Sequence, residues 1–178
     1  LPEPATPAAA RSRSVSSGEA ADSEFVVSEI LPGFLFLGPD IATTSEAEHL
    51  VSDLGVRRIL NCALEIEEGG GKHLALNEGR LGIEKYRKIP LKDTVEAEDV
   101  QSHIDEACTF LDDARLYGTP TYVHCKAGKS RSVLVVMAYL IHHLGWPLSQ
   151  AYSHVVARRR TVSPNLGFVA ELMAFEKR

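Results

Sequence analysis

The sequence predicts an α/β domain with a central, mainly parallel sheet of about four to five strands, flanked by helices on both faces. Short apolar segments of strand length alternate with longer segments that have helical spacing of apolar residues. Strands that alternate with helices in this way form parallel sheets covered on both sides. The chain has 178 residues, of which 44% are hydrophobic, and this suffices for one domain with a single core.

The ends of the domain are suggested by composition. Residues 1–23 are mostly Pro, Ala, Ser and Gly, so we expect a disordered polar tail before a folded domain over 24–178. The tail lacks the apolar stretch of a secretory signal, and no apolar run reaches the ~20 residues of a membrane-spanning helix. Because position 1 is Leu rather than Met, we expect further chain upstream. Three cysteines without framework spacing indicate a reducing compartment, the cytoplasm and also the nucleus.

The first elements are a pair of short strands and a helix. Strands are expected at 26–31 and 34–37, because both segments are apolar and a Pro-Gly turn separates them. The pattern Ser45-x-x-Glu48 is typical of a capping box and predicts a helix that runs to residue 54, before a glycine.

Two further strands enclose a glycine-rich segment. Residues 56–61 are apolar and predict a buried strand, and residues 86–91 predict another. Between them, residues 65–82 contain three consecutive glycines and scattered polar residues, which predict a surface loop.

The second half of the chain is mostly helical. Apolar residues recur on one face over 99–117 and predict a helix that ends at a glycine. A fourth buried strand is expected at 121–124, followed by an apolar helix over 130–144. The last two helices are expected over 147–159 and 164–177, each with Pro at its first turn.

Charge is distributed unevenly along the chain. The net charge is −5, yet residues 120–178 carry eight basic side chains and only two acidic ones. This part of the chain should therefore attract an anionic ligand.

The most informative segment joins the fourth buried strand to the apolar helix. It reads His124-Cys125-Lys126-Ala127-Gly128-Lys129-Ser130-Arg131-Ser132. Ligands of open α/β sheets bind at the edge formed by the carboxyl ends of the strands, which is where this segment begins. A loop that contains a glycine can turn its N–H groups inward there, around an anion. The start of the helix and the Arg131 guanidinium add positive charge, which favours the thiolate form of Cys125. A thiolate inside an oxyanion-binding loop can attack a phosphate monoester, and Ser132 can donate a hydrogen bond when that thiolate leaves.

The segment allows two other interpretations. A cysteine that ends a strand is usually an inert core residue, but an arginine six positions later, at the start of a helix, favours a catalytic role. Gly128-Lys129-Ser130 also matches the end of a nucleotide-binding loop, but that pattern requires glycine where Val123 stands. The segment therefore favours a catalytic cysteine.

The reaction also requires an acid that protonates the leaving oxygen. Asp93 follows the strand expected at 86–91, whose end should lie beside that of the cysteine-bearing strand. Asp99 is the alternative, although it is also a candidate cap for the helix that follows it. Asn61 ends another strand at this edge, and Asn165 precedes the last helix, so the amide of each is expected to brace the loop.

The segment resembles the signature of the cysteine-based protein tyrosine phosphatase superfamily, and most of residues 25–178 is similar to its dual-specificity branch. The matching features are Glu29-Ile30-Leu31-Pro32, Leu35-Phe36-Leu37-Gly38, Ile59-Leu60-Asn61, Ile89-Pro90-Leu91-Lys92-Asp93 and Ser163-Pro164-Asn165-x-Gly167-Phe168. From about residue 120, the chain resembles fungal MAP-kinase phosphatases. The resemblance implies a phosphocysteine on Cys125, phosphoryl binding by Arg131, general acid and base roles for Asp93, and no metal or cofactor.

Two further residues, Arg160 and Cys62, have roles that the resemblance implies. Arg160 would line a second anionic pocket, although dipole complementarity and solubility account for arginines near a helix end. Cys62 would trap an oxidised Cys125 as a reversible disulfide, whereas Cys108 lies on a buried helix stripe and is expected to be inert. His124 is expected to order the loop rather than to transfer protons.

The favoured substrate is a phosphorylated protein, with a MAP kinase as the natural choice, and no nucleic-acid partner is expected. Lys126 and Lys129 suggest an alternative, because the loop is also similar to those of tensin-like phosphoinositide phosphatases and mitochondrial phosphatidylglycerophosphate phosphatases. A non-catalytic phosphate-binding module is a third hypothesis, but it predicts loss of the nucleophile or the acid, and both are present.

Overall fold

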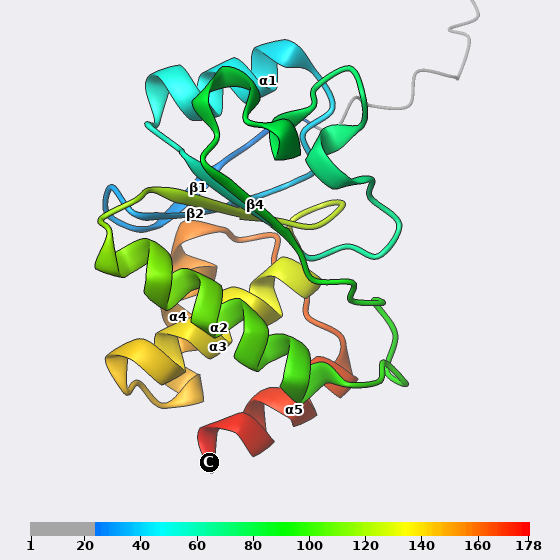
Figure 1. Ribbon diagram of the computed structural model, residues 1–178. Coiled ribbons are helices and arrows are strands. Elements are labelled where there is room, and N and C mark those ends of the chain that lie inside the picture. The colour runs from blue at the N-terminus through cyan, green and yellow to red at the C-terminus, as the bar shows by residue number, and fades with distance from the viewer. Residues whose placement is uncertain (1–23) are drawn as a thin grey trace, which may run out of the picture.

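The computed structural model describes residues 24–178, which form one sheet with helices on both faces (Figure 1). The predicted fold class is confirmed, whereas the predicted tail over 1–23 lies outside the described residues. The five strands are β1 (Ser28–Leu31), β2 (Leu35–Gly38), β3 (Arg58–Asn61), β4 (Lys85–Lys88) and β5 (Thr121–His124). Their order is β1-β2-β5-β3-β4, and only β1 pairs antiparallel to its neighbour.

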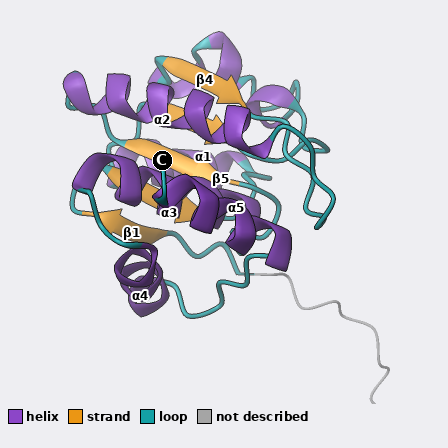
Figure 2. Ribbon diagram, turned by 90° about the horizontal axis from the view of Figure 1, so that it is seen from below, coloured by secondary structure: helices purple, strands orange, loops and turns teal. Residues whose placement is uncertain are grey.

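The helices divide unequally between the two faces of the sheet. One face is covered by α2 (Val100–Leu116), α3 (Arg131–Leu144), α4 (Leu148–Arg158) and α5 (Leu166–Glu176), as Figure 2 shows from below. The other face carries α1 (Thr44–Glu48), a π-helical turn (His49–Asp53) and the segment 65–82. Of these helices α3 is the most buried, since every residue from Arg131 to Ile141 is buried. No helix among residues 24–178 is long and apolar enough to cross a membrane.

Three local predictions require correction. The capping box is formed by Thr43 and Glu46, not by Ser45 and Glu48, so the helix begins earlier. The segment 65–82 is more than a surface loop, because it contains three short 3-10 helices and buries Leu74 and Leu76 against the sheet. These apolar side chains explain why the segment is ordered despite its glycines.

The strand predicted over 86–91 is shorter than expected. It begins at Lys85 and ends at Lys88, and its side chains are exposed or half-buried because β4 is an edge strand. Ile89 and Leu91 are buried beyond the end of this strand, where they join the main core. The apolar pattern therefore reflected core packing rather than strand pairing.

The register of the parallel strands places the functional loop. Gly38, Asn61 and His124 are aligned at the carboxyl ends of β2, β3 and β5. Since β5 is the central strand, the chain that leaves it at Cys125 emerges between the ends of its two neighbours. This edge is where ligands of parallel sheets bind.

Candidate active site

Cys125 lies in a loop whose polar groups point at its sulfur. Its Sγ is 3.1 Å from the Ser132 hydroxyl, and the residue is only 3% exposed. Burial opposes ionisation, but hydrogen bonds from the Ser132 hydroxyl and from the backbone N–H groups of Ser132, Gly128 and Ser130 outweigh it. Together they lower the pKa of Cys125 below its ordinary value. The loop thus stabilises a sulfur anion.

Glycine is required at position 128 on two counts. Gly128 has a φ of +66°, in the region that other residues rarely adopt. A Cβ atom there would also lie 2.5 Å from the carbonyl carbon of Gly38, at the end of β2. The loop therefore packs backbone against backbone on the neighbouring strand.

Arg159 holds the outer side of the loop, a role that sequence reasoning missed. Its guanidinium donates to the carbonyl oxygens of Gly128 at 2.7 Å and Ala127 at 3.2 Å. It also donates to the Val26 carbonyl at 2.8 Å and the Ser28 hydroxyl at 3.2 Å, and it is only 8% exposed. Because the loop carbonyls point outward to Arg159, the N–H groups are left to face inward. Among the three consecutive arginines, burial rather than the sequence distinguishes this one.

Arg131 is fixed by a second residue that was not predicted, Glu65. The carboxylate accepts from Nη1 at 2.5 Å and Nη2 at 2.6 Å, and the Leu91 carbonyl accepts from Nη1 at 3.2 Å. Nε of Arg131 is buried and has no hydrogen-bond partner within residues 24–178. Glu65 thus occupies the Nη1–Nη2 edge and leaves the edge that carries Nε for an oxyanion. The hydrogen bonds from Arg131 lower the pKa of Glu65 to about 2, so the pair is ionised at neutral pH.

Asp93 lies beside this loop. One carboxylate oxygen accepts from the Ser130 hydroxyl at 2.7 Å and from the Asn165 side-chain amide at 2.8 Å. The Asn165 backbone N–H donates to the same hydroxyl at 3.2 Å, and its side-chain oxygen caps α5 through the Phe168 N–H at 2.9 Å. Asn165 thus supports Asp93 and Ser130 together, and Asp93 is exposed.

The alternative acid, Asp99, occupies a different position. It precedes α2 at the N-cap, with a left-handed backbone (φ 55°) and no capping hydrogen bond from its side chain. Its geometry gives no reason to place it in the reaction, whereas Asp93 hydrogen-bonds to a loop residue.

Asn61 and His124 support different parts of the site. The sequence predicts that the Asn61 amide braces the 125–131 loop, but its hydrogen bonds go to other residues. It donates to the Ile66 carbonyl at 3.1 Å and accepts from the Ala63 N–H at 3.0 Å, and so braces the turn that carries Glu65. His124 lies at 3.0 Å from the Cys125 carbonyl through Nδ1, and burial lowers its pKa to about 4. It is therefore neutral at physiological pH and donates from Nδ1, because a carbonyl can only accept.

The other two cysteines are buried thiols. Burial, followed by the negative charge of Cys125, raises the pKa of Cys62. Burial raises the pKa of Cys108 to about 12. Neither is set up as a nucleophile, and the pairing of Cys62 with an oxidised Cys125 stays a prediction.

A hollow of about 490 Å³ adjoins the catalytic loop on the side of its two lysines. Its cationic lining consists of Lys126, Lys129, Arg158, Arg159 and Arg160. Glu24 is the acidic residue in the lining, so the hollow is strongly positive. Arg160 lines this hollow, and its part in binding a second anion stays a prediction.

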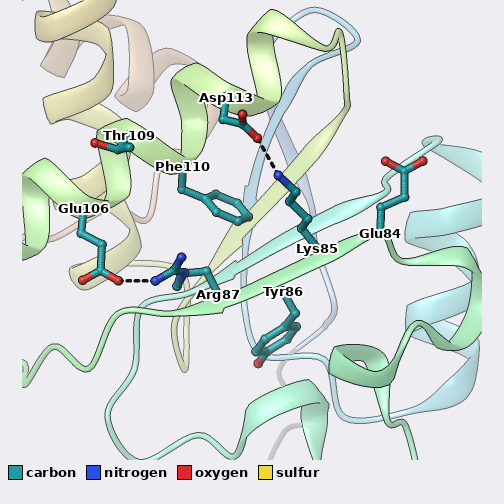
Figure 3. Close-up of a pocket in the computed structure, with 8 residues that line it drawn as sticks. All are labelled: Glu84, Lys85, Tyr86, Arg87, Glu106, Thr109, Phe110 and Asp113. Atoms are coloured by element: carbon teal, nitrogen blue, oxygen red, sulfur yellow. Dashed lines mark hydrogen bonds and ion pairs between the residues drawn. The ribbon is translucent and has the colours of Figure 1, made fainter.

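A larger hollow, of about 660 Å³, lies between β4 and α2 (Figure 3). Lys85 pairs with Asp113 at 2.9 Å, and Arg87 pairs with Glu106 at 2.9 Å, so these charges already have partners. Asp113 also accepts from the buried Arg58 at 2.5 Å. None of the catalytic-loop residues lines this hollow, and its ion pairs serve stability rather than chemistry.

Comparisons with known proteins agree with this geometry. A family model described as "Dual specificity phosphatase, catalytic domain" matches residues 35–178. The chain is 37% identical to human dual specificity protein phosphatase 5 over 148 residues, 83% of this chain and 35% of that protein. It is 36% identical to Mpk3 of Drosophila melanogaster over 148 residues, 83% of this chain and 33% of that one. The chain thus spans about a third of the length of these curated relatives.

Solved structures show the same similarity. The crystal structure of human DUSP28 superposes with a TM-score of 0.70 at 28% identity, covering 85% of this chain and 93% of that chain. A mouse putative dual specificity phosphatase complexed with zinc tungstate superposes with a TM-score of 0.73 at 28% identity, covering 91% and 93%.

Proposed function

The chain belongs to the dual-specificity phosphatase family, and we propose that it hydrolyses phosphotyrosine and phosphoserine or phosphothreonine esters on a protein through Cys125. The observation that carries the proposal is the placement of the Cys125 sulfur among inward-facing N–H groups, next to an arginine that is fixed on one edge. Asp93 hydrogen-bonds to the same loop and so lies within reach of a leaving oxygen.

The proposed first step transfers the phosphoryl group to sulfur. The Cys125 thiolate attacks phosphorus, an S–P bond forms and the P–O ester bond breaks. The loop N–H groups and the free edge of Arg131 bind the three equatorial oxygens, whose charge they match. Protonated Asp93 gives its proton to the departing alkoxide or phenolate.

The proposed second step releases phosphate. Asp93, now a carboxylate, takes a proton from water as the water oxygen attacks phosphorus and the S–P bond breaks. The sulfur leaves as a thiolate, which the Ser132 hydroxyl at 3.1 Å stabilises by a hydrogen bond. Each residue returns to its starting state, so the cycle needs no metal or cofactor.

The cationic hollow supports a substrate with two neighbouring phosphates. With one phosphate on the catalytic loop, a second phosphate on the same peptide would meet Arg160 and Lys129 in the adjoining hollow. A doubly phosphorylated MAP-kinase segment has this chemistry, and it is the substrate we favour. It would be met in the cytoplasm or the nucleus.

A second candidate substrate is a phosphoinositide head group. It is favoured by the exposure of both Lys126 and Lys129 at the mouth of the site. Two lysines within the loop suit a compact ligand that carries several phosphates, as a head group does.

Hydrolysis rates separate these candidates. We would compare kcat/KM for a singly phosphorylated tyrosine peptide, a Thr/Tyr doubly phosphorylated peptide and a soluble phosphoinositide head group, with Cys125→Ser as the inactive control. We expect the doubly phosphorylated peptide to be the best substrate and to lose its advantage in Arg160→Ala but not in Lys177→Ala, which removes an exposed cation at the end of α5. Faster hydrolysis of the head group would favour the lipid candidate. Equal rates for wild type and Cys125→Ser would refute the proposed function.

A further inference from the structure

The segment that carries Asp93 has little apolar anchoring of its own. Leu91 and Val100 are buried at its two ends, but residues 92–96 are exposed, and Val95 is 57% exposed. The conformation of this segment, here called the acid loop (residues 92–99), must therefore be set by polar contacts and by close backbone packing.

The acid loop meets the first turn of α5 at Gly167. A Cβ atom built on Gly167 would lie 2.7 Å from the Val95 carbonyl oxygen and 2.8 Å from the Val95 Cα. Both are backbone atoms, so the contact cannot be relieved by turning a flexible side chain. Any side chain at position 167 must push the acid loop away from α5.

The backbone of Gly167 does not itself require glycine. The residue lies inside the regular helix α5, and its φ is outside the positive range that ten other glycines of the described chain adopt. Within a helix, glycine is less favourable than alanine by about 1 kcal/mol. The close approach of Val95 is therefore what accounts for glycine at this position.

We propose that Gly167 is a positioning residue for the acid of the reaction. By having no side chain, it lets the acid loop dock on α5 and holds Asp93 in reach of Ser130 and Asn165, without any ligand being bound. The inference rests on the proposed function, in which Asp93 protonates the leaving oxygen.

The proposal separates activity from stability. Gly167→Ala should not lower the thermal unfolding midpoint, because alanine favours the helix while the acid loop is displaced locally. The ratio kcat/KM, which covers the steps up to release of the leaving group, should fall only where protonation of the leaving group matters; the role of Asp93 as a base in the second step affects kcat for all substrates alike. General acid catalysis contributes about 10²–10⁴-fold, and a displacement of about 1 Å can remove 10²-fold, so we expect a loss of roughly tenfold on a poor leaving group.

The test is a leaving-group comparison in four proteins. We would measure kcat/KM for phenyl phosphate, which has a poor leaving group, and p-nitrophenyl phosphate, which has a good one, in wild type, Gly167→Ala, Asp93→Ala and the double variant. Leu166→Ala is the matched control, because Leu166 is the neighbouring residue of α5 and is 81% exposed. We expect Gly167→Ala to lower kcat/KM on phenyl phosphate about tenfold and to have no additional effect once Asp93 is absent.

The outcomes distinguish this inference from the function on which it rests. If Asp93→Ala lowers kcat/KM on phenyl phosphate selectively and Gly167→Ala does not, the positioning role is wrong and the proposed function stands. If Asp93→Ala has no selective effect, the acid assignment itself fails. Equal losses on both substrates in Gly167→Ala would assign only a structural role. Hydrogen exchange provides a check independent of turnover, since the amides of residues 94–98 should exchange faster in Gly167→Ala.

Discussion

The bidentate contact between Glu65 and Arg131 gives a quantitative prediction, which Glu65→Gln tests. Glutamine keeps the length of the side chain, but its amide presents one acceptor and one donor to a guanidinium edge that only donates. One of the two hydrogen bonds, at 2.5 and 2.6 Å, is therefore replaced by a donor facing a donor. We expect Arg131 to rotate away from the geometry that leaves its Nε edge open.

The magnitude follows from the exposure of the pair. A hydrogen bond to a charged group contributes about 1.5–3 kcal/mol when buried, but the Glu65 side chain is 49% exposed, which places the loss near the lower end. A loss of about 1.5 kcal/mol in transition-state stabilisation is roughly a tenfold decrease in kcat/KM. Removal of a negative charge near a phosphate site acts in the opposite direction, and this effect must be measured separately.

The assay compares Glu65→Gln with Glu67→Gln on p-nitrophenyl phosphate, together with inhibition by orthovanadate. Glu67 and Glu65 line one hollow, a third one, between residues 40–42 and 65–73. Among the described residues Glu67 makes no ion pair with Arg131, so Glu67→Gln isolates the effect of removing a negative charge. We expect about a tenfold loss of kcat/KM and weaker vanadate binding in Glu65→Gln, and less than a twofold change in Glu67→Gln. Equal activity of the two variants would refute a positioning effect on Arg131.

Three further predictions concern residues around the loop. Arg159→Met should lower the free energy of unfolding by about 3 kcal/mol, because it leaves the buried Gly128 carbonyl and the buried Ser28 hydroxyl without this partner; denaturant unfolding measures this, and an unchanged midpoint would contradict the role of Arg159. The pKa of His124 is lowered from 6.5 to about 4 by burial, so only the unfolded state takes up a proton as pH falls through 6.5. Stability should therefore fall by up to about 3 kcal/mol between pH 6.5 and pH 4 and level off below, and His124→Gln, compared by urea unfolding at each pH, should remove this contribution; an unaltered slope would show that other groups cause it. Ser132→Ala should slow release of phosphate more than attack, so that a phosphoenzyme accumulates in rapid-quench mass spectrometry; a lower phosphoenzyme level than in wild type would contradict this.

The parts of the site that could be predicted are those with local signals. The catalytic loop is continuous in sequence, and strand alternation places its start at the carboxyl end of β5. The prediction of Asp93 followed from the same reasoning, because residues 86–91 lead the chain to the carboxyl edge of the sheet, where β5 also ends. For the residues of the catalytic loop, sequence proximity and spatial proximity coincide, whereas Asp93 is 37 positions from Ser130 and was placed by the expected alignment of strand ends.

Glu65 and Arg159 could not be predicted in the same way. Glu65 contacts Arg131 across 66 positions of sequence, from a segment whose glycines suggest only a loop. Its position four residues after the end of β3 is a signal that it lies near the site, but other acidic residues follow in the same segment, so the signal does not single out Glu65. Arg159 is flanked by two arginines of the same chemistry, and its burial depends on how the chain leaves α4, since Arg159 is the C-cap residue and has an extended backbone (φ −141°, ψ 93°).

The central claim is that the loop lowers the pKa of the Cys125 thiol, and ultraviolet titration of thiolate absorbance tests it most directly. The difference between wild type and Cys125→Ser isolates this group, since burial raises the pKa of Cys62 and of Cys108. The account predicts a thiolate that forms below the ordinary thiol pKa of about 8.5, and a shift of this step to higher pH in Ser132→Ala. A difference signal that develops only above that value would contradict the account.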